Sequence, residues 1–366
     1  MEKFNTEWEY LIHLLNTVIK DTEPSEMPEN LDFGKLFETA AHHSVANTAY
    51  YAIEKLKRKP DAVLLSRWAE IRDREIIKDT TQLVELEIIS EAFSSAGIRF
   101  ILLKGSVLKN LYPQSDFRTM SDLDIYIDKE DMKKASAILT ENGYHSHTLE
   151  EGVHDVYYKE PVMNVELHTG LFGFDGNEFN KIFTDLWKES VLADGTKYEL
   201  SNDYFFAFLL AHGIKHYRTG GSGIRCFMDI YIYRKAFGEK IDLHKVRALF
   251  DSVRSKEMFD DFLMLSEAWF EGREYTKKIA DMAEYIVRGG VYGSFENYTL
   301  YGMNKNGKWT FFFQRLFPTF DFMKEHYPIL RKAPILLPFC WIKRIIRALT
   351  KYRGQTVEKF NTFKNN

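Results

Sequence analysis

Two aspartates separated by one apolar residue, Asp122 and Asp124, are the side chains of this sequence best suited to hold a divalent metal ion. Apolar residues alternate with them, which predicts a strand carrying both carboxylates on one face. Residues 162–168 also alternate and predict a second strand, on which Glu166 is the candidate third carboxylate. Three carboxylates indicate Mg²⁺ or Mn²⁺, the ions with which phosphoryl-transfer sites neutralise a triphosphate.

A turn before the first aspartate offers groups that can contact phosphate. The apolar run 100–103 predicts a short buried strand, and Gly105-Ser106 ends it ahead of a helical pattern. A small pair of residues between a strand and a helix lets backbone N–H groups and a hydroxyl approach phosphate oxygens. Strand alternation places Lys104 on the face of Leu102. Lys104 is therefore either a phosphate ligand or a lysine that reaches out to solvent.

Further polar residues have two interpretations each. Arg118 can clamp a triphosphate through two hydrogen bonds, or it can face solvent from a loop. His168 follows Glu166 by two residues and faces the same way; it orients the acceptor or moves its proton, or it hydrogen-bonds the metal-binding carboxylates. His212 and His216 have the spacing of metal ligands on a helix, but no glutamate follows the first histidine, which argues against zinc.

These motifs resemble the DNA polymerase β-like nucleotidyltransferase superfamily, and within it a bacterial branch of uncharacterised nucleotidyltransferases. The resemblance covers residues 95–235 and is carried by Leu103-Lys104-Gly105, Tyr112-Pro113, Arg118, Asp122-Leu123-Asp124 and Glu166-Leu167-His168. It also includes a helix with His212, Lys215 and His216 and a later segment with Arg225 and Asp229. These last residues imply a wall of the nucleotide pocket, with structural polar contacts as the alternative.

The resemblance implies an enzyme that uses Mg²⁺ or Mn²⁺ to transfer a nucleoside monophosphate from an NTP to a hydroxyl-type acceptor, releasing pyrophosphate. The acceptor, a small molecule or a protein, is not identified by the sequence. The implied catalytic metal ligands are Asp122, Asp124 and Glu166. The implied nucleotide-binding residues are Lys104, Gly105, Ser106, Arg118, His168, His212, Lys215, His216, Arg225 and Asp229.

Other conspicuous residues favour structural roles. Asp116 and Asp128 lie outside the acid-apolar-acid motif and are expected to be solvated or to form turns. His42-His43 stands among alanines and indicates helix packing. The turn 220–223 is glycine-rich but follows a helix and lacks the Lys-Ser/Thr ending of a phosphate loop, so it predicts a flexible helix–helix turn that orders over the substrate.

The elements that must position these residues divide the chain into four parts. Helical spacing predicts an N-terminal helical domain over 1–95, including a long helix from Ala62 to Ala96 that ends at Gly97. Short strands and helices predict the catalytic core over 96–200. Helical stretches at 204–216, 223–237 and 242–270 predict a C-terminal helical domain over 201–323, followed by a basic, aromatic-rich segment over 324–366. The expected fold class is α+β, a polymerase-β-like core of a small mixed sheet with helices, flanked by the two helical domains.

The distribution of charge along the chain indicates which kinds of molecule it is suited to bind. The net charge of the 366 residues is −4, yet residues 324–366 hold ten lysines and arginines against two glutamates, so the rest of the chain is acidic. An acidic body argues against a long nucleic acid as substrate. The sequence has only two cysteines, Cys226 and Cys340, which are far apart, and it shows neither a secretory pattern nor an apolar stretch long enough to span a membrane. These features predict a cytoplasmic protein.

The basic segment at the C-terminal end is compatible with other functions. Its apolar and basic residues have the spacing of an amphipathic helix, which predicts either contact with an anionic membrane or ordinary packing. The sequence therefore leaves two alternatives to the transferase with an unidentified acceptor. One is a catalytically silent scaffold on anionic lipid or on machinery that builds surface polysaccharide, and the other is a toxin-like nucleotidyltransferase acting on protein or tRNA. The helix residues are Trp341, Ile342, Lys343, Arg344, Ile345, Ile346, Arg347 and Leu349.

Overall fold

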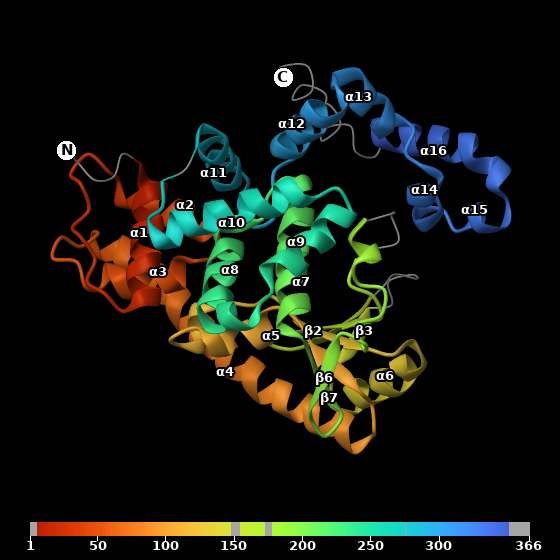
Figure 1. Cartoon of the computed structure of the whole chain (residues 1–366), viewed down its shortest axis with the longest axis horizontal. Coiled ribbons are helices and arrows are strands. Elements are labelled where there is room, and N and C mark those ends of the chain that lie inside the picture. Colours follow the sequence, from red (N-terminus) through yellow and green to blue (C-terminus); the bar gives the residue numbers. More distant parts are fainter. Residues whose placement is uncertain (1–5, 148–153, 173–177, 275, 351–366) are drawn as a thin grey trace.

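The computed structural model describes residues 6–147, 154–172, 178–274 and 276–350, and it shows a mixed α/β fold built on one sheet (Figure 1). The sheet has seven strands in the order β3-β4-β5-β2-β1-β7-β6. This confirms the expected combination of a mixed sheet with many helices. The strands are β1 Phe100–Leu102, β2 Leu123–Ile127, β3 His145–His147, β4 His154–Lys159, β5 Met163–His168, β6 Ser190–Asp194 and β7 Lys197–Leu200.

The centre of the sheet mixes parallel and antiparallel pairs. β1 is antiparallel to β2, whereas β2 is parallel to β5 and β1 is parallel to β7. In the β2–β5 pair Asp124 lies opposite Glu166. Because side chains of directly paired residues project to the same side of a sheet, this register places the two carboxylates next to each other.

Two helices cover the face of the sheet opposite these carboxylates. α4 (Ala62–Ser95) and α6 (Met132–Glu141) pack Phe93 and Leu139 against Ile125, all fully buried. α4 begins at Asp61, whose side chain accepts a hydrogen bond from the backbone of Leu64, and ends before Gly97, which has a φ of +70°. The long helix predicted over 62–96 is confirmed.

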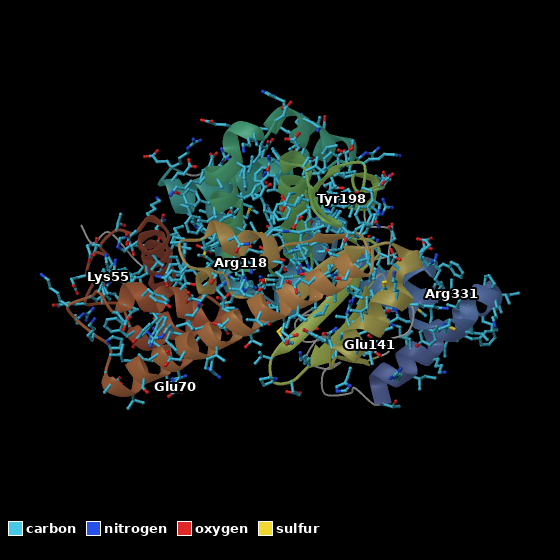
Figure 2. All side chains as sticks on the ribbon, turned by 90° about the horizontal axis from the view of Figure 1, so that it is seen from below. Lys55, Glu70, Arg118, Glu141, Tyr198 and Arg331 are labelled. Atoms are coloured by element: carbon cyan, nitrogen blue, oxygen red, sulfur yellow. The ribbon has the colours of Figure 1, made fainter. Side chains whose placement is uncertain are left out.

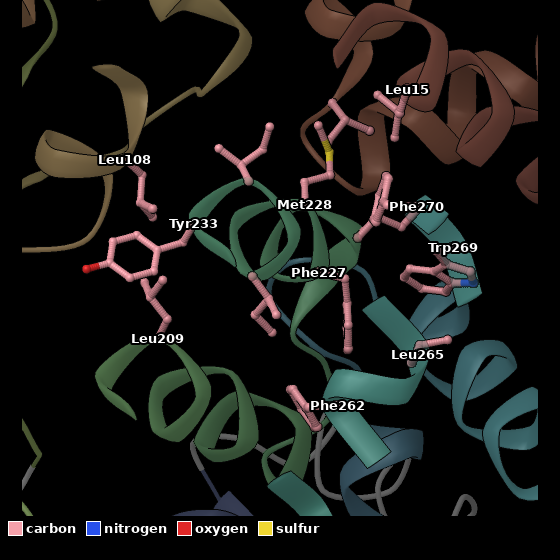
Figure 3. Close-up of a cluster of buried hydrophobic side chains, with 14 of the residues drawn as sticks. Leu15, Leu108, Leu209, Phe227, Met228, Tyr233, Phe262, Leu265, Trp269 and Phe270 are labelled. Carbon is pink, nitrogen blue, oxygen red and sulfur yellow. The ribbon is translucent and has the colours of Figure 1, made fainter. Parts of the chain in front are cut away.

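The other face of the sheet shares a large hydrophobic core with helices from both ends of the chain. Figure 3 shows Leu15, Leu108, Leu209 and Phe270 around this core; they belong to the N-terminal helices, the catalytic segment and the C-terminal helices. The division at residues 95, 200 and 323 stays a prediction, and the packing joins the first three ranges. The N-terminal helices are α1 Glu7–Lys20, α2 Phe33–His42 and α3 Ala46–Ile53.

The helices after the sheet follow the predicted pattern with one break. α7 (Asn202–Arg218) and α8 (Gly223–Phe237) match the expected helices, but the stretch 242–270 forms two helices. The chain turns at Arg254, which has a φ of +56°, and the backbone N–H of Ser255 bonds to the carbonyl of Phe250. The helices that follow α8 are α9 Leu243–Ser252, α10 Lys256–Glu271, α11 Lys277–Gly289 and α12 Phe295–Asn306.

Residues 308–350 form a segment that we call the arm, which extends from α12 at the edge of the molecule (Figure 1). A small cluster of its own, with Met323, Leu330 and Cys340 at its centre, holds it together. None of the helices in the described part of the chain is long and apolar enough to cross a membrane. The last sixteen residues of the predicted basic segment, 351–366, lie outside the described residues. The arm helices are α13 Lys308–Leu316, α14 Phe320–His326, α15 Ile329–Lys332 and α16 Leu337–Thr350.

Candidate active site

The centre of the candidate site is formed by three side chains from two adjacent strands. Asp124 projects from β2, and Glu166 and His168 project from β5. One donor atom from each of the three lies within 4.8 Å of the other two. Asp124 is only 2% exposed. The structure therefore brings together two of the predicted carboxylates, with a histidine beside them.

Asp122 lies just outside this group. It precedes β2 by one residue and is not among the three side chains whose donor atoms converge. Burial and the nearby Asp124 raise the pKa of Asp122 to about 6, and Glu166 contributes in the same direction. These effects place Asp122 within the electrostatic reach of the cluster, as a carboxylate that is costly to ionise without a cation.

Lys104 and His168 both contact Asp124. The Lys104 ammonium donates to Asp124 Oδ1 at 2.6 Å, and His168 Nε2 lies 2.8 Å from the same oxygen. Burial alone would raise the pKa of Asp124, but Lys104 and His168 outweigh it and lower the pKa. Burial would lower the pKa of His168, yet its bonds to Asp124 and to Glu166, 3.5 Å away, raise it. Asp124 is thus held ionised by the Lys104 ammonium and by its hydrogen bond with His168.

Lys104 reaches Asp124 through an unusual backbone conformation. Its φ of +48° and ψ of −119° lie outside the regions that L-residues ordinarily occupy. Strand alternation predicted Lys104 on the face of Leu102, which packs in the core beneath the opposite face of the sheet. That prediction is wrong, because the turn reverses the direction of the side chain at Lys104. Strain of this kind costs about 1–3 kcal/mol and is found where a site needs it.

The residues after Lys104 begin the short helix α5 (Gly105–Leu108). A Cβ atom on Gly105 would lie 2.4 Å from the buried Met120 side chain, so any larger residue here would have to displace Met120. Ser106 is 2% exposed, and its hydroxyl has no hydrogen-bond partner in the described part of the chain. The side-chain oxygen of Asn164, two residues before Glu166 on the same face of β5, is buried and also lacks a partner. Buried polar atoms of this kind call for a ligand or water.

Arg118 and Asp229 are joined in a buried network, which contradicts the solvent-facing alternative for the arginine. Arg118 Nε donates to Asp229 Oδ1 at 2.7 Å, and the Tyr112 hydroxyl donates to the same oxygen at 2.7 Å. Arg225 donates to the carbonyl of Thr119 at 3.0 Å. Burial and the neighbouring Arg118 lower the pKa of Arg225 to about 10. Sequence reasoning gave Tyr112 no role, although its place in the family motif was a signal.

α7 supplies a pair of histidines beside Lys104. His216 Nε2 lies 3.1 Å from His212 Nε2, a distance at which one ring donates to the other. Burial lowers the pKa of His216 to about 4 and that of His212 well below its usual value, and Lys104 contributes to both shifts. Both rings are therefore neutral at physiological pH. The Lys215 ammonium lies 5.9 Å from the centre of the Phe172 ring.

The two remaining aspartates have structural partners. Asp116 is 8% exposed and accepts a hydrogen bond of 2.8 Å from the Tyr51 hydroxyl, so it is not solvated. It lies in a 3-10 turn, Ser115–Phe117, which agrees with the other predicted alternative, a turn residue. Asp128 pairs with Arg99 and accepts from the Trp187 indole at 2.8 Å. Neither belongs to the convergent group of donors.

The histidine pair near the N-terminus and the glycine turn both serve packing. His43 is fully buried, with Nε2 3.0 Å from the Val287 carbonyl and Nδ1 accepting from the Ile224 N–H, which confirms the packing interpretation. The turn 220–223 is buried against residues 289–294; a Cβ atom on Gly221 would lie 2.6 Å from the carbonyl oxygen of Gly290. The turn connects α7 and α8 as predicted, but this close packing contradicts the predicted flexibility.

The sequence also matches a known protein family. The sequence model described as an uncharacterised nucleotidyltransferase matches residues 29–271, about two thirds of the chain. The match includes the strands with Asp124 and Glu166, the turn at Lys104 and the helices with His212 and Asp229. Searches of curated proteins and of solved structures gave no match. The chain therefore belongs to the family of uncharacterised nucleotidyltransferases, and it is a transferase enzyme.

Proposed function

We propose that the protein uses Mg²⁺ or Mn²⁺ to transfer a nucleoside monophosphate from an NTP to a hydroxyl-type acceptor on a polymerase-β-like core. The single observation that carries the proposal is the placement of Asp124 directly opposite Glu166 on parallel strands, with His168 completing a group of donors within 4.8 Å. In the reaction the acceptor oxygen attacks the α-phosphorus, the bond to the β-phosphate breaks and pyrophosphate leaves. The proton of the acceptor passes to a carboxylate of the cluster.

The donor set fits a divalent cation. Asp124 and Glu166 offer oxygen atoms, which Mg²⁺ and Mn²⁺ prefer, and His168 offers a nitrogen, which Mn²⁺ accepts more readily than Mg²⁺. Asp122, whose pKa is raised by burial and by the neighbouring Asp124, is a further oxygen ligand in this proposal. A bound divalent ion supplies positive charge that neutralises the triphosphate and lowers the pKa of the acceptor hydroxyl. Lys104 already supplies one positive charge at Asp124.

The phosphate-binding part of the proposal rests on charge and on unpartnered groups. Arg118 and Arg225 lie together with one carboxylate, Asp229, which Arg118 engages. Among the described residues Arg225 forms no ion pair, so its guanidinium is the cation best placed to bind a phosphate bidentately. The backbone N–H groups of Gly105-Ser106 and the unpartnered Ser106 hydroxyl are proposed to contact the distal phosphates.

The remaining predicted residues form the wall of the nucleotide pocket in this proposal. His212 and His216 are neutral and face Lys104, so they can accept or donate hydrogen bonds without adding charge beside the triphosphate. Lys215 lies on the same helix and is proposed to contact the nucleotide at its edge. Arg118 and Asp229 are proposed to position this wall through their ion pair.

The test measures nucleotide binding first and chemistry second. Thermal unfolding is recorded with each of the four NTPs and Mg²⁺ or Mn²⁺, and pyrophosphate release is then measured with the nucleotide that stabilises most. Asp124→Asn should abolish release and keep the fold. Asp116→Asn is the matched control, because Asp116 is also buried but lies outside the donor group. Full activity of Asp124→Asn, or no metal-dependent stabilisation by any NTP, would refute the proposal and favour the scaffold alternative.

The same reaction identifies the acceptor. A labelled NTP is incubated with the enzyme and cell extract, and the label is followed into small molecules, protein and tRNA. Mass spectrometry of the labelled fraction then gives the mass added to the acceptor. Label in protein or tRNA alone would favour the toxin-like alternative.

A further inference from the structure

α16 of the arm presents an apolar stripe to solvent. Phe339, Ile342 and Ile346 follow one another at spacings of three and four residues, which places them on one side of the helix. Ile335 precedes them in the turn before α16. These four side chains are 68, 55, 56 and 84% exposed, in the order Phe339, Ile342, Ile346 and Ile335. Large aliphatic and aromatic groups in a continuous row are costly to leave in water and mark a contact surface.

The stripe is not the result of a loosely attached helix, because the other side of α16 is anchored. Cys340 is buried in the small core of the arm, and Trp341 packs against the same core. The Trp341 indole donates to the carbonyl of Pro318 at 3.0 Å, and Arg344 donates to the carbonyl of Arg315 at 2.8 Å. α16 therefore has one side that holds the arm together and a second apolar side that nothing in the described chain covers.

Positive charge lies directly beside the stripe. Lys343 and Arg347 are exposed and one helical turn apart, on the flank next to Ile342 and Ile346. Residues 326–350 contain five lysines and arginines and no aspartate or glutamate, although the chain as a whole carries a net charge of −4. An apolar stripe bordered by basic residues is the pattern of a helix that lies in the surface of an anionic membrane.

We propose that the arm docks on an anionic lipid surface through this stripe, with Phe339, Ile342 and Ile346 among the acyl chains and Lys343 and Arg347 at the phosphate headgroups. Charge argues for lipid over a second copy of the chain, because a two-fold contact through this face would bring the basic flanks of two copies together. The arm lies beyond residue 271, where the family match ends. Docking would hold the enzyme at a lipid surface, and this proposal does not depend on the proposed reaction.

The arm and the candidate active site lie in different parts of the molecule (Figure 2). Figure 2 shows Arg331 of the arm at the edge of the molecule and Arg118, which belongs to the candidate site, near its middle. In Figure 1 the arm likewise lies apart from α5 and β2. Docking through α16 therefore takes place at a part of the molecule that lies apart from α5 and β2.

The test is flotation of the full chain with phosphatidylcholine vesicles that contain, or lack, phosphatidylglycerol. The chain should float with the anionic vesicles only, and binding should fall as salt rises. Lys343→Gln with Arg347→Gln should reduce the partition coefficient at low salt by at least about tenfold, from about fivefold for each basic residue near the surface. Phe339→Ser with Ile346→Ser should reduce binding at both salt concentrations, because apolar contacts are not screened.

Matched variants separate docking from general effects. Lys129→Gln with Lys133→Gln removes the same charge from exposed positions next to and in α6, and Ile77→Ser removes an exposed aliphatic residue from α4. Both controls should bind vesicles as the wild type does. Three results would overturn the proposal: no flotation, binding that neither the salt nor the α16 variants change, or a dimer in solution that Phe339→Ser with Ile346→Ser converts to a monomer. The last result would assign the stripe to a second copy.

Discussion

Removing the ammonium of Lys104 should destabilise the metal-free protein and make its stability depend strongly on divalent metal. Asp124 is 2% exposed and Lys104 pairs with it at 2.6 Å, so Lys104→Ala leaves a buried carboxylate with one cationic partner fewer. Breaking a buried ion pair from one side costs about 3–5 kcal/mol. A divalent ion bound to Asp124 replaces the lost charge, so most of that loss should be recovered when Mg²⁺ or Mn²⁺ is added.

The backbone of Lys104 gives a second, opposite effect that can be measured on the same residue. Its positive φ costs about 1–3 kcal/mol in any L-residue, and glycine avoids most of this strain. Lys104→Gly should therefore be more stable than Lys104→Ala by about 1 kcal/mol or more, although glycine usually destabilises relative to alanine. The two variants share the loss of the ammonium, so their difference isolates the strain in the turn.

The assay is urea unfolding of each variant in EDTA and in excess Mg²⁺ or Mn²⁺. Lys109→Ala is the control, because Lys109 is 1% exposed and pairs with Asp79 away from the donor group. Lys109→Ala should lose about as much unfolding free energy as Lys104→Ala does, but added metal should not restore it. If metal stabilises Lys104→Ala no more than it stabilises the wild type, the predicted role of the ammonium is wrong. If Lys104→Ala is at least as stable as Lys104→Gly, the predicted strain at this residue is wrong.

Three further predictions concern chemistry, nucleotide affinity and pH. Glu166→Gln should lower turnover by about 10²-fold or more and weaken metal–NTP binding less than Asp122→Asn does, as isothermal titration can show; the reverse order would mean that their roles are exchanged. Arg225→Ala should raise the KM for the NTP with a smaller effect on the affinity for a nucleoside monophosphate. Equal losses in the two assays would show that Arg225 does not contact the distal phosphates. Burial lowers the pKa of His43 to about 4, so the unfolded chain takes up this proton before the folded chain as the pH falls below 6.5, and this group should contribute a loss of stability of about 3 kcal/mol between pH 6.5 and 4. His212 and His216 contribute in the same direction, so His43→Gln should make the slope in denaturant titrations less steep by the His43 part, whereas a change at the exposed His42 should leave the slope as it is.

The parts of the site that sequence could predict are those that depend on local periodicity. Alternation in two apolar runs was enough to place Asp124 and Glu166 on strand faces, because the period of a strand is fixed by backbone geometry. The end of the long helix followed from Gly97, which has a positive φ in the structure. The same periodicity also indicated that His168 faces as Glu166 does, although its contact with Asp124 needed the strand pairing.

What sequence could not predict depends on single backbone angles and on distant partners. The turn at Lys104 and the break at Arg254 arise from residues that are neither glycine nor asparagine and still have positive φ, which no propensity indicates. Asp116 is buried and accepts a hydrogen bond from Tyr51, which lies far away in the sequence, on α3 of the N-terminal region. The ion pair of Arg118 with Asp229 likewise joins residues that are far apart in the chain, so only the packed fold reveals it.

The contact between the two glycine-containing turns has a consequence for how related proteins vary in length. The turn 220–223 lies inside the family match, whereas the residues 289–294 that pack on it lie outside, and the N–H of Ser294 and the side chain of Asn297 both donate to the carbonyl of Gly220. A shorter relative that stops near residue 271 would expose this carbonyl and a flat, glycine-lined surface to water. The residue at position 221 should then carry a side chain in such relatives, whereas position 220, with a φ of +116°, favours glycine in either case. Glycine at position 221 should accompany a C-terminal extension that supplies the second turn.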